Sequence, residues 1–171
     1  MNTIEKNFSH RPVREDDLEI ISAFASNEEE LFFFYPKAAF PLTPWQLRTS
    51  IDKRADSTVV EMNGEVIGFA NFYLWETGGI CSIGNVVISP RARGLGAGRY
   101  LMRVMISLAV EKYQANEIRV ACFNRNTSAL LLYQSLGFKP VTIEVRHDKQ
   151  RGRVALIHLN LHPQGDTSNN Y

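Results

Sequence analysis

The sequence predicts an α/β (α+β) fold, built on a mixed, mostly antiparallel twisted sheet of about seven strands flanked by about four helices. Three observations predict it. Segment 65–75 is apolar at both alternating sets of positions, which is typical of a strand covered on both faces. A helical pattern joins segments 80–88 and 117–123, so these fourth and fifth strands are expected to be parallel. Two segments, 137–147 and 153–161, flank a polar turn and predict a terminal hairpin.

The composition is that of an ordinary globular protein. The chain has 171 residues, of which 44% are hydrophobic and 22% charged, enough for one domain with a proper core. The chain has 19 Lys and Arg residues and 18 Asp and Glu residues, so its net charge is close to zero. We therefore expect no nucleic-acid or membrane partner. We predict a single domain over residues 1–161 and a disordered polar tail over residues 162–171.

Other sequence features point to a cytoplasmic protein. The first residues lack an apolar core of signal-peptide length, and no stretch approaches the roughly 20 apolar residues that span a bilayer. Cys81 and Cys122 lie in apolar runs without a paired-cysteine motif, which predicts buried, reduced thiols. The histidines form no cluster typical of metal ligands, so we expect no metal.

The N-terminal third is predicted to hold one strand and two helices. Residues 7–13 form the strand, and residues 14–26 form a helix with apolar residues at helical spacing. Segment 28–43 is expected to be irregular because two prolines interrupt it. Thr43 is expected to cap the next helix, with Gln46 as its capping-box partner, and that helix should end near residue 54.

Turn and cap residues define the remaining elements. Asn63-Gly64 predicts a tight hairpin turn before the strand 65–75, because both residues accept positive φ. Gly78-Gly79 turns the chain into the fourth strand. Asn126 is expected to cap a helix that Gly137 ends, with an apolar face that includes Tyr133.

The stretch ISPRARGLGAGRYL, residues 88–101, joins a strand to a helix with three glycines and three arginines. A helix N-terminus presents unpaired N–H groups and partial positive charge, and glycines let an anion approach the backbone. The stretch lacks the GK[ST] ending of a P-loop, and a dinucleotide fingerprint that begins at Gly94 is broken at Arg99. A phosphate-binding loop of another kind is therefore predicted, and a mere tight turn is the alternative.

Two motifs resemble the GNAT superfamily of acyl-CoA N-acyltransferases. The glycine stretch is similar to its pyrophosphate loop, [R/Q]-x-x-G-x-[G/A]. NRNTSALLLYQSLGF is similar to its N-x-x-A-x-x-x-Y-x-x-x-G-F signature, with Asn126, Ala129, Tyr133, Gly137 and Phe138 at the defined positions. The order of elements resembles the superfamily over about residues 10–161.

The resemblance implies that acetyl-CoA, as acyl-donor cosubstrate, binds where the fourth and fifth strands splay apart. It assigns the pyrophosphate to the loop amides, the pantetheine to strand backbone, the cofactor arm to Asn126 and the region of the thioester sulfur to Tyr133. The implied cofactor-binding residues are Val86, Val87, Ile88, Arg93, Gly94, Leu95, Gly96, Ala97, Gly98, Arg99, Asn126 and Tyr133.

The resemblance also implies acetyl transfer to a primary amine of a small molecule or peptide. A neutral amine would attack the thioester directly, a backbone N–H between Asn85 and Val87 would stabilise the oxyanion, and Tyr133 would protonate the leaving thiolate. No acyl-enzyme is needed, so Cys122 has no role as a nucleophile. For Tyr133, a place in the apolar core is the alternative, and Asn85 has the alternative of a strand bulge.

The general base and the acceptor site are less defined by the sequence. Many superfamily members carry a glutamate in the fourth strand, where this chain has Ser82, Gly84 and Asn85. Substitute bases are Glu30 and Glu76 first, then Glu61 and His147, or the amine arrives neutral. Aromatic residues of segment 31–45 would line the acceptor pocket or, equally well, fill the core.

Two other functions stay open at this point. A non-catalytic acyl-CoA sensor would use the same loop and would need no base. A nucleotide-binding oxidoreductase is disfavoured by the broken fingerprint and by the late position of the loop. The terminal hairpin could also pair with a second subunit to give a homodimer, since edge strands invite partners.

Overall fold

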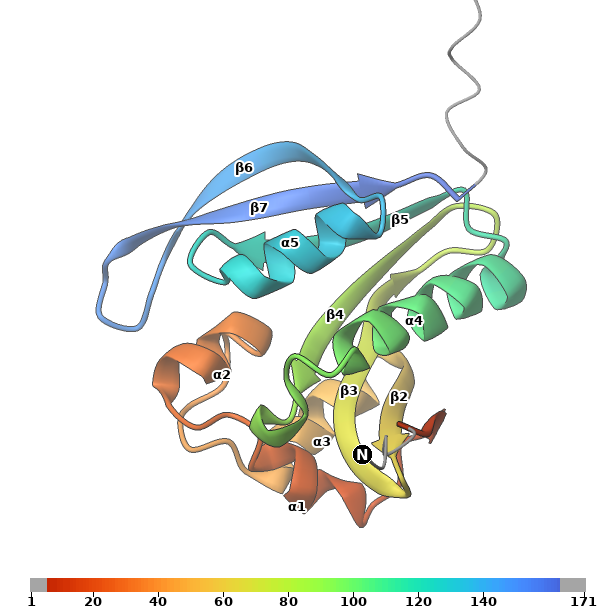
Figure 1. Ribbon diagram of the computed structural model, residues 1–171. Coiled ribbons are helices and arrows are strands. Elements are labelled where there is room, and N and C mark those ends of the chain that lie inside the picture. The colour runs from red at the N-terminus through yellow and green to blue at the C-terminus, as the bar shows by residue number, and fades with distance from the viewer. Residues whose placement is uncertain (1–5, 164–171) are drawn as a thin grey trace, which may run out of the picture. The chain divides into compact units, whose positions relative to one another are not determined.

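The structure, a computed structural model, describes residues 6–163 (Figure 1). Seven strands, five α-helices and one short 3₁₀ helix make up this part of the chain. In chain order they are β1 (Phe8–Pro12), α1 (Asp17–Ser22), α2 (Glu28–Phe34), α3 (Pro44–Asp52), β2 (Ala55–Met62), β3 (Glu65–Trp75), β4 (Ile80–Ile88), η1 (Pro90–Ala92), α4 (Ala97–Tyr113), β5 (Glu117–Phe123), α5 (Thr127–Ser135), β6 (Lys139–His147) and β7 (Arg153–Leu161).

The strands form one mixed sheet in the order β1-β2-β3-β4-β5-β7-β6. β4 and β5 are parallel, and their register runs from Ile80 opposite Glu117 to Ile83 opposite Val120. The recorded pairs of β1 with β2 and of β7 with β5 and β6 are antiparallel. The predicted mixed sheet with parallel fourth and fifth strands is therefore confirmed.

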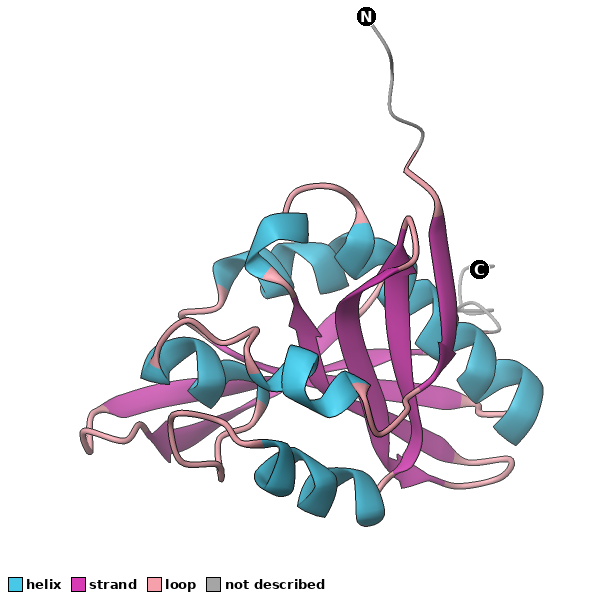
Figure 2. Cartoon of the chain, turned by 90° about the horizontal axis from the view of Figure 1, so that it is seen from below, coloured by secondary structure: helices cyan, strands magenta, loops and turns pink. Residues whose placement is uncertain are grey.

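The chain divides into two compact units, and Figure 2 distinguishes their helices, strands and loops. The first comprises residues 1–71 and 85–104, and the second comprises residues 72–84 and 105–171. β3, β4 and α4 each contribute to both units. The single-domain prediction for residues 1–161 stays a prediction, and the predicted disorder of the tail falls mainly on residues 164–171, outside the described part.

The core of the first unit lies between its N-terminal helices and its strands. Leu18 and Ile21 of α1, Leu47 of α3, and Val59 and Phe69 of the sheet belong to one buried cluster. Residues 66–72 of β3 are all buried, which confirms that this strand is covered on both faces. The sheet thereby gives a rigid base to the loop that follows β4.

The core of the second unit lies under α5. Ile118 and Val120 of β5, Leu159 of β7, and Tyr133 and Phe138 are all buried. Gly137 has a φ of 98° and ends α5 as predicted. Asn126 stands at the N-cap position of α5, but its side chain makes no capping hydrogen bond, so the predicted side-chain cap is wrong.

The turns and the α3 cap follow the sequence prediction. Asn63 and Gly64 have φ values of 52° and 83°, as a type I′ turn requires. Thr43 Oγ1 accepts a hydrogen bond from the Gln46 N–H at 3.3 Å. The Gln46 side chain, however, reaches the backbone of Ala39 and Pro41 and so anchors the preceding loop.

The segment expected to be irregular contains the helix α2. The Asn27 side chain accepts from the Glu30 N–H at 2.8 Å, and the Glu30 carboxylate accepts from the Ser26 N–H at 2.8 Å. The first bond satisfies one of the free donors at the helix start, and the second binds the residue before the cap to the first turn of α2. α1 is correspondingly shorter than predicted and ends at Ser22, whose hydroxyl donates back to the Leu18 carbonyl at 2.6 Å.

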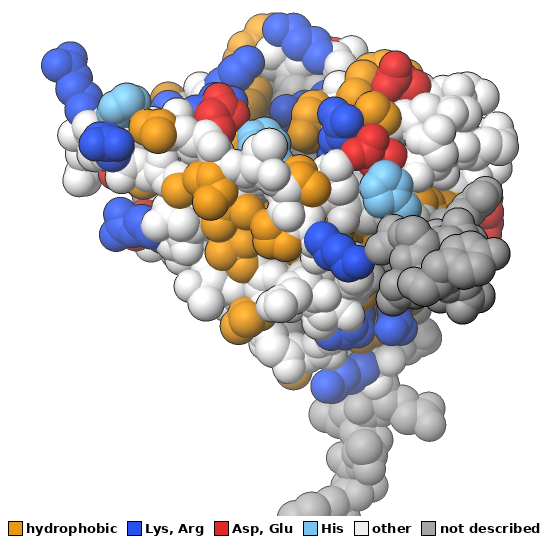
Figure 3. Space-filling view, turned by 90° about the horizontal axis from the view of Figure 1, so that it is seen from above, with side chains coloured by type: hydrophobic (Ala, Val, Ile, Leu, Met, Phe, Trp, Pro, Cys, Tyr) orange, Lys and Arg blue, Asp and Glu red, His pale blue; other side chains and the backbone are white. Residues whose placement is uncertain are grey.

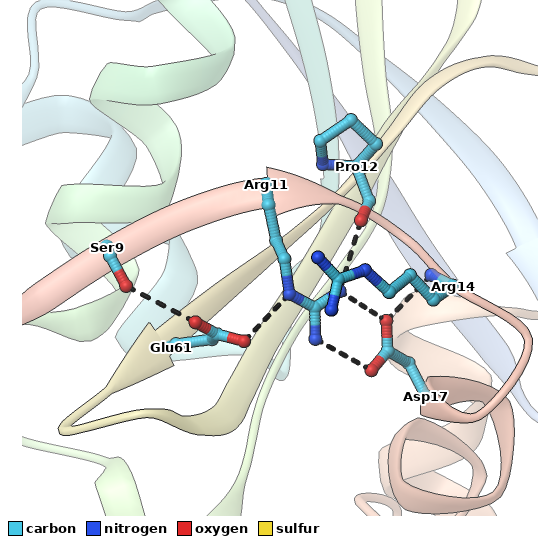
Figure 4. Close-up of polar contacts among 6 residues, drawn as sticks. All are labelled: Ser9, Arg11, Pro12, Arg14, Asp17 and Glu61. Atoms are coloured by element: carbon cyan, nitrogen blue, oxygen red, sulfur yellow. Dashed lines mark hydrogen bonds and ion pairs between the residues drawn. The ribbon is translucent and has the colours of Figure 1, made fainter.

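An ion-pair network connects β1, α1 and β2 in the first unit (Figure 4). The Arg11 guanidinium donates to both carboxylate oxygens of Asp17 at 2.7 and 2.9 Å and to Glu61 at 2.8 Å. The Arg14 N–H donates to Asp17 at 2.7 Å. Because these donors favour the charged carboxylate, the pKa of Asp17 lies below its usual value.

Among the helices described, none is both long and apolar enough to cross a membrane.

Candidate functional site

The glycine stretch forms an exposed turn between β4 and α4. η1 covers Pro90–Ala92, Gly94 and Gly96 have φ values of 74° and 91°, and α4 begins at Ala97. These φ values are readily adopted by glycine and rarely by other residues. With Gly94 and Gly96 at positive φ, the chain turns after β4 and enters the N-terminus of α4.

The turn has the features of an anion site. A Cβ placed on Gly94 would meet no heavy atom within 4 Å, and one placed on Gly96 would meet only the Phe8 ring, at 3.9 Å. The loop backbone is therefore accessible from outside. The first amides of α4 take no part in the hydrogen bonds of the helix, and they carry its partial positive charge. A pyrophosphate fits this combination of open backbone and helix N-terminus.

Arg93, the first residue of the predicted pyrophosphate loop, is paired with Glu30. Its guanidinium lies 3.0 Å from the Glu30 carboxylate at the start of α2. Arg93, together with the Ser26 N–H, holds the pKa of Glu30 below its ordinary value. A carboxylate with a lowered pKa is a weaker base, so Glu30 is better suited to holding the loop than to accepting a proton.

Asn85 of β4 is buried, and its side-chain amide makes three hydrogen bonds. Its φ is 51°, a left-handed conformation that Asn adopts more readily than most residues. Its Oδ1 accepts from Ser50 Oγ at 2.6 Å and from Asn71 Nδ2 at 3.1 Å. Its Nδ2 donates to the Phe34 carbonyl at 2.8 Å. One amide thus connects β4 to the end of α2, to α3 and to β3.

The backbone assigned to pantetheine follows directly after Asn85. Val86 and Ile88 are half-buried and Val87 is buried, and the parallel register with β5 ends earlier, at Ile83. The Ser89 N–H donates to the Ile67 carbonyl at 2.8 Å, which ties the end of β4 to β3. In the first unit, the structure therefore places Val86–Ile88 and the loop Arg93–Arg99 on consecutive segments.

Asn126 and Tyr133, the other two residues predicted to bind the cofactor, belong to the second unit. Tyr133 of α5 is buried, and its ring packs edge-on against Phe138 with the centroids 6.0 Å apart. Burial raises the pKa of Tyr133 well above its ordinary value. Asn126 is half-buried, and its carbonyl lies 3.5 Å from Cys122 Sγ.

Cys122 has the character of an inert thiol. It is buried in β5, and burial raises its pKa to about 12. The thiolate, which is the nucleophilic form, is therefore scarce near neutral pH. Cys81 is buried as well, and both cysteines are free, as the sequence predicts.

The aromatic segment mainly fills the core. Phe32 and Phe34 are buried, and Tyr35 donates from its hydroxyl to the Gln46 carbonyl at 3.2 Å. Phe40 and Trp45 are exposed. The alternative of core packing thus describes Phe32 and Phe34 better than an open acceptor wall does.

The structure also places the other three residues that were considered as general bases, Glu61, Glu76 and His147. Glu61 is held by Arg11 at 2.8 Å. Glu76 lies in the β3–β4 turn, where Gly78 donates its N–H to the Tyr113 carbonyl at the C-terminal end of α4. His147 is exposed at the end of β6.

Sequence reasoning missed the long-range partners of Asn85 and Arg93, and it missed the helix α2. The partners of Asn85 and of Arg93 are 14 to 63 positions distant in sequence, so no local pattern predicts them. A signal for α2 did exist, because Asn27 and Glu30 have capping-box spacing.

Comparison with solved structures shows the same fold. A GCN5-related N-acetyltransferase from Kribbella flavida superposes with a TM-score of 0.72 at 26% identity, covering 91% of this chain and 97% of that one. The ribosomal-protein-S18-alanine N-acetyltransferase from Escherichia coli has a TM-score of 0.70 at 22% identity, covering 96% and 99%. A Salmonella typhimurium structure with its cofactor acetyl-CoA has a TM-score of 0.69 at 18% identity, covering 95% and 98%.

Sequence comparison identifies the family. A spermine/spermidine N(1)-acetyltransferase from Bacillus subtilis (strain 168) is 28% identical over 82 residues, which are 44% of this chain and 54% of the relative. This chain thus spans about half the length of that curated relative. The model of the acetyltransferase (GNAT) family matches residues 20–138, which include the glycine stretch and the Asn126–Phe138 signature. The chain belongs to the acetyltransferase (GNAT) family.

Proposed function

We propose that the chain is an acetyl-CoA-dependent N-acetyltransferase that acetylates a primary amine of a small molecule or peptide. The observation that carries the proposal is the exposed turn between β4 and α4, with Gly94 and Gly96 at positive φ directly before a helix N-terminus. This turn offers open backbone and partial positive charge to the pyrophosphate of CoA. The Salmonella typhimurium structure with acetyl-CoA supports the same donor.

The proposal assigns the donor substrate to named parts of the chain. The amides of Arg93–Arg99 bind the pyrophosphate, and the backbone of Val86–Ile88 binds the pantetheine as an added strand would. Asn126 hydrogen-bonds the pantetheine arm. A backbone N–H between Asn85 and Val87 is the donor for the developing oxyanion.

The reaction requires one proton acceptor and one proton donor. The neutral amine nitrogen forms a bond to the thioester carbonyl carbon, and the carbon–sulfur bond breaks. The amine then loses a proton and the CoA sulfur gains one. Tyr133 is the proposed donor, because it occupies the tyrosine position of the Asn126–Phe138 signature. Burial raises its pKa, so the hydroxyl is protonated near neutral pH but is a weaker acid than an exposed tyrosine. The high pKa of Cys122 supports direct transfer without an acyl-enzyme.

We infer that the amine proton leaves through water or before binding, rather than to Glu30. β4 carries no carboxylate, and Glu30, one of the two candidates ranked first from the sequence, is engaged by Arg93 and by the Ser26 N–H. Such a carboxylate, with a pKa below its ordinary value, gains little by accepting a proton.

The proposed acceptor class rests on the relatives and on the composition of segment 31–45, of which Phe40 and Trp45 are exposed. One relative is a spermine/spermidine N(1)-acetyltransferase, and a second protein of the same fold is a ribosomal-protein-S18-alanine N-acetyltransferase. The aromatic segment 31–45 of this chain carries one lysine and no arginine, aspartate or glutamate. This favours an amine on an apolar body or a peptide terminus over a highly charged polyamine.

A non-catalytic acyl-CoA sensor is the second candidate, favoured by the absence of a carboxylate from β4. Amine-dependent release of free CoA separates the two. The purified chain is incubated with acetyl-CoA and, in turn, with spermidine, an alanine-terminated peptide and an aromatic amine. Thiol release that depends on one of these amines supports the transferase, whereas acetyl-CoA binding without release from any amine contradicts it and favours the sensor.

A further inference from the structure

A chain of side-chain hydrogen bonds runs through the first unit from Arg54 to the end of α2. The Arg54 guanidinium, between α3 and β2, donates to Asn71 Oδ1 at 3.1 Å. Asn71 Nδ2 of β3 donates to Asn85 Oδ1 at 3.1 Å, and Asn85 Nδ2 donates to the Phe34 carbonyl at 2.8 Å. We call these three side chains and the Phe34 carbonyl the amide relay.

The two ends of the amide relay fix its direction. A guanidinium only donates hydrogen bonds and a carbonyl only accepts them, whereas an asparagine side chain can present either its oxygen or its nitrogen to a neighbour. With the donor Arg54 at one end and the acceptor Phe34 at the other, both asparagines point their oxygens toward Arg54. The three hydrogen bonds therefore run head to tail. The Ser50 hydroxyl also donates to the Asn85 oxygen, at 2.6 Å, which agrees with this direction.

Arg54 supplies a fixed positive charge at the donor end of the amide relay. Figure 3 shows Lys and Arg side chains on the surface, where water and salt screen their charges. Both asparagines of the relay, in contrast, are buried, and Arg54 itself is half-buried. In such surroundings a charged donor makes a stronger hydrogen bond than a neutral one, and bonds that run head to tail polarise one another. Loss of the Arg54 charge should therefore weaken every bond of the relay.

The amide relay contains the residue at which the backbone assigned to the reaction begins. Asn85 has a φ of 51° and is the first residue of the segment Asn85–Val87, whose N–H groups include the proposed oxyanion donor. A left-handed residue other than glycine persists only where its surroundings hold it in that conformation. The hydrogen bonds of the Asn85 amide to α3, to β3 and to the end of α2 provide this restraint. The direction of the N–H groups that follow therefore depends on the relay.

We propose that Arg54 is a positioning residue for acetyl transfer, which acts through Asn71 on Asn85. Arg54 sets the direction of the amide relay and thereby keeps the backbone N–H between Asn85 and Val87 aimed at the developing oxyanion. Arg54 itself needs no contact with either substrate. The inference rests on the proposed function, because an oxyanion develops only if the chain transfers an acyl group.

Steady-state kinetics of Arg54→Met tests this role. Methionine keeps an unbranched stem but has no donor, so kcat should fall by about 10- to 100-fold, the effect of a misplaced oxyanion donor. KM for acetyl-CoA should stay within about threefold, because the amide relay contains none of the loop residues assigned to the pyrophosphate. Lys53→Met removes the same charge at the exposed neighbouring position and should leave kcat unchanged. Equal kcat values for the two variants overturn the proposal.

Two further variants separate action through Asn71 from a general loss of stability. Arg54→Lys keeps a charged donor, and one N–H is enough for the bond to Asn71, so this variant should recover most of the lost kcat. Asn71→Ala removes the middle of the amide relay, and adding Arg54→Met to it should lower kcat by less than about twofold more. Full additivity of the two losses contradicts action through Asn71. An Arg54→Lys variant as slow as Arg54→Met contradicts the need for a charged donor.

Nuclear magnetic resonance tests the amide relay without any turnover. The resonances of the Asn85 side-chain NH₂ group and of the Val86 backbone N–H should shift in Arg54→Met and stay in place in Lys53→Met. Unchanged resonances in Arg54→Met overturn the proposal, whatever the activity, and leave the proposed function untouched. If the resonances shift but the wild type releases no CoA with any amine, the proposed function is wrong, and the positioning role of Arg54 is wrong with it.

Discussion

At the scale of single residues, Asn85 determines the local geometry of the first unit. It combines a left-handed backbone with a buried amide whose oxygen and nitrogen are both hydrogen-bonded. The left-handed residue changes the direction of β4 just before the backbone assigned to the donor substrate. Its contact with the Phe34 carbonyl also holds the end of α2.

Asn85→Ala is expected to reduce the free energy of unfolding by roughly 2–5 kcal/mol, because it leaves buried polar groups unpaired and puts Ala at positive φ. Asn63→Ala is the matched control, since Asn63 has nearly the same φ of 52° but lies in an exposed turn. Urea unfolding of both variants measures the difference. Equal losses would show that the backbone conformation, and not the hydrogen-bond network, accounts for the role of Asn85.

Tyr133→Phe is expected to lower turnover by about 10- to 1000-fold while acetyl-CoA affinity is unchanged, because only the proton donor is lost. Free-CoA release with the best amine gives the turnover, and calorimetry gives the affinity. Since the pKa of Tyr133 is raised, its ionisation should cause no fall in wild-type activity on moderately alkaline titration. Wild-type turnover in Tyr133→Phe would remove this hydroxyl from the mechanism.

At the scale of elements, capping and turn chemistry explain which parts of the fold were predictable. The Asn63-Gly64 hairpin turn, the Thr43 cap and the strand-to-helix turn of the glycine stretch are local patterns, and the structure confirms these three conformations. Pyrophosphate binding by the glycine stretch stays a prediction. α2 was missed because its aromatic run and the following prolines outweighed the short Asn27–Glu30 signal. The Asn126 cap was wrong because its φ and ψ of −86° and 66° depart from the usual N-cap conformation.

Gly96→Val is expected to abolish acetyl-CoA binding, because valine is strained at a φ of 91° and its side chain covers the open backbone. Gly64→Val is the control. Gly64 has a φ of 83° and open space around it, but it lies in the β2–β3 turn. Calorimetric titration of both variants should find binding only in Gly64→Val, and retained binding in Gly96→Val would place the pyrophosphate elsewhere.

Glu30→Gln distinguishes an ion-pair partner from a general base. Loss of the charge frees Arg93 for an anion, so acetyl-CoA affinity should rise by about 2- to 5-fold, the effect of one surface ion pair. Turnover should change by less than about threefold, whereas loss of a general base lowers it by at least about 100-fold. Initial rates at saturating substrate decide between them, and a large fall would restore Glu30 as the base.

At the scale of the whole molecule, the side-chain contacts between residues distant in sequence are the part that could not be predicted from the sequence. The strand order could be argued from hairpins and one crossover, each of them local in sequence. The partners of Asn85, Arg93 and Arg11 come from distant elements. Residue types alone do not determine such pairs, and the glutamate proposed as a base therefore proved to be an ion-pair partner.

Stability against acid should depend on Asp17. Its folded pKa is lowered, so its contribution is present above the unfolded pKa of about 3.9 and is lost as the pH falls toward the folded value. Asp17→Asn should lower the free energy of unfolding by about 1–3 kcal/mol at neutral pH. This deficit should shrink at acidic pH, where the wild type loses the same charge.

Urea unfolding at neutral pH and at about pH 3 measures this dependence. Asp16→Asn, at the exposed neighbouring position, serves as the control and should change stability little at either pH. A deficit of Asp17→Asn that is the same at both values would show that the carboxylate charge does not stabilise the fold.

Calorimetric titration of the purified chain with acetyl-CoA, with NADH as the control ligand, tests the central claim most directly. The account predicts saturable binding of acetyl-CoA with one site per chain and no binding of NADH. Absence of acetyl-CoA binding would contradict it and would leave the glycine stretch between β4 and α4 as a structural turn.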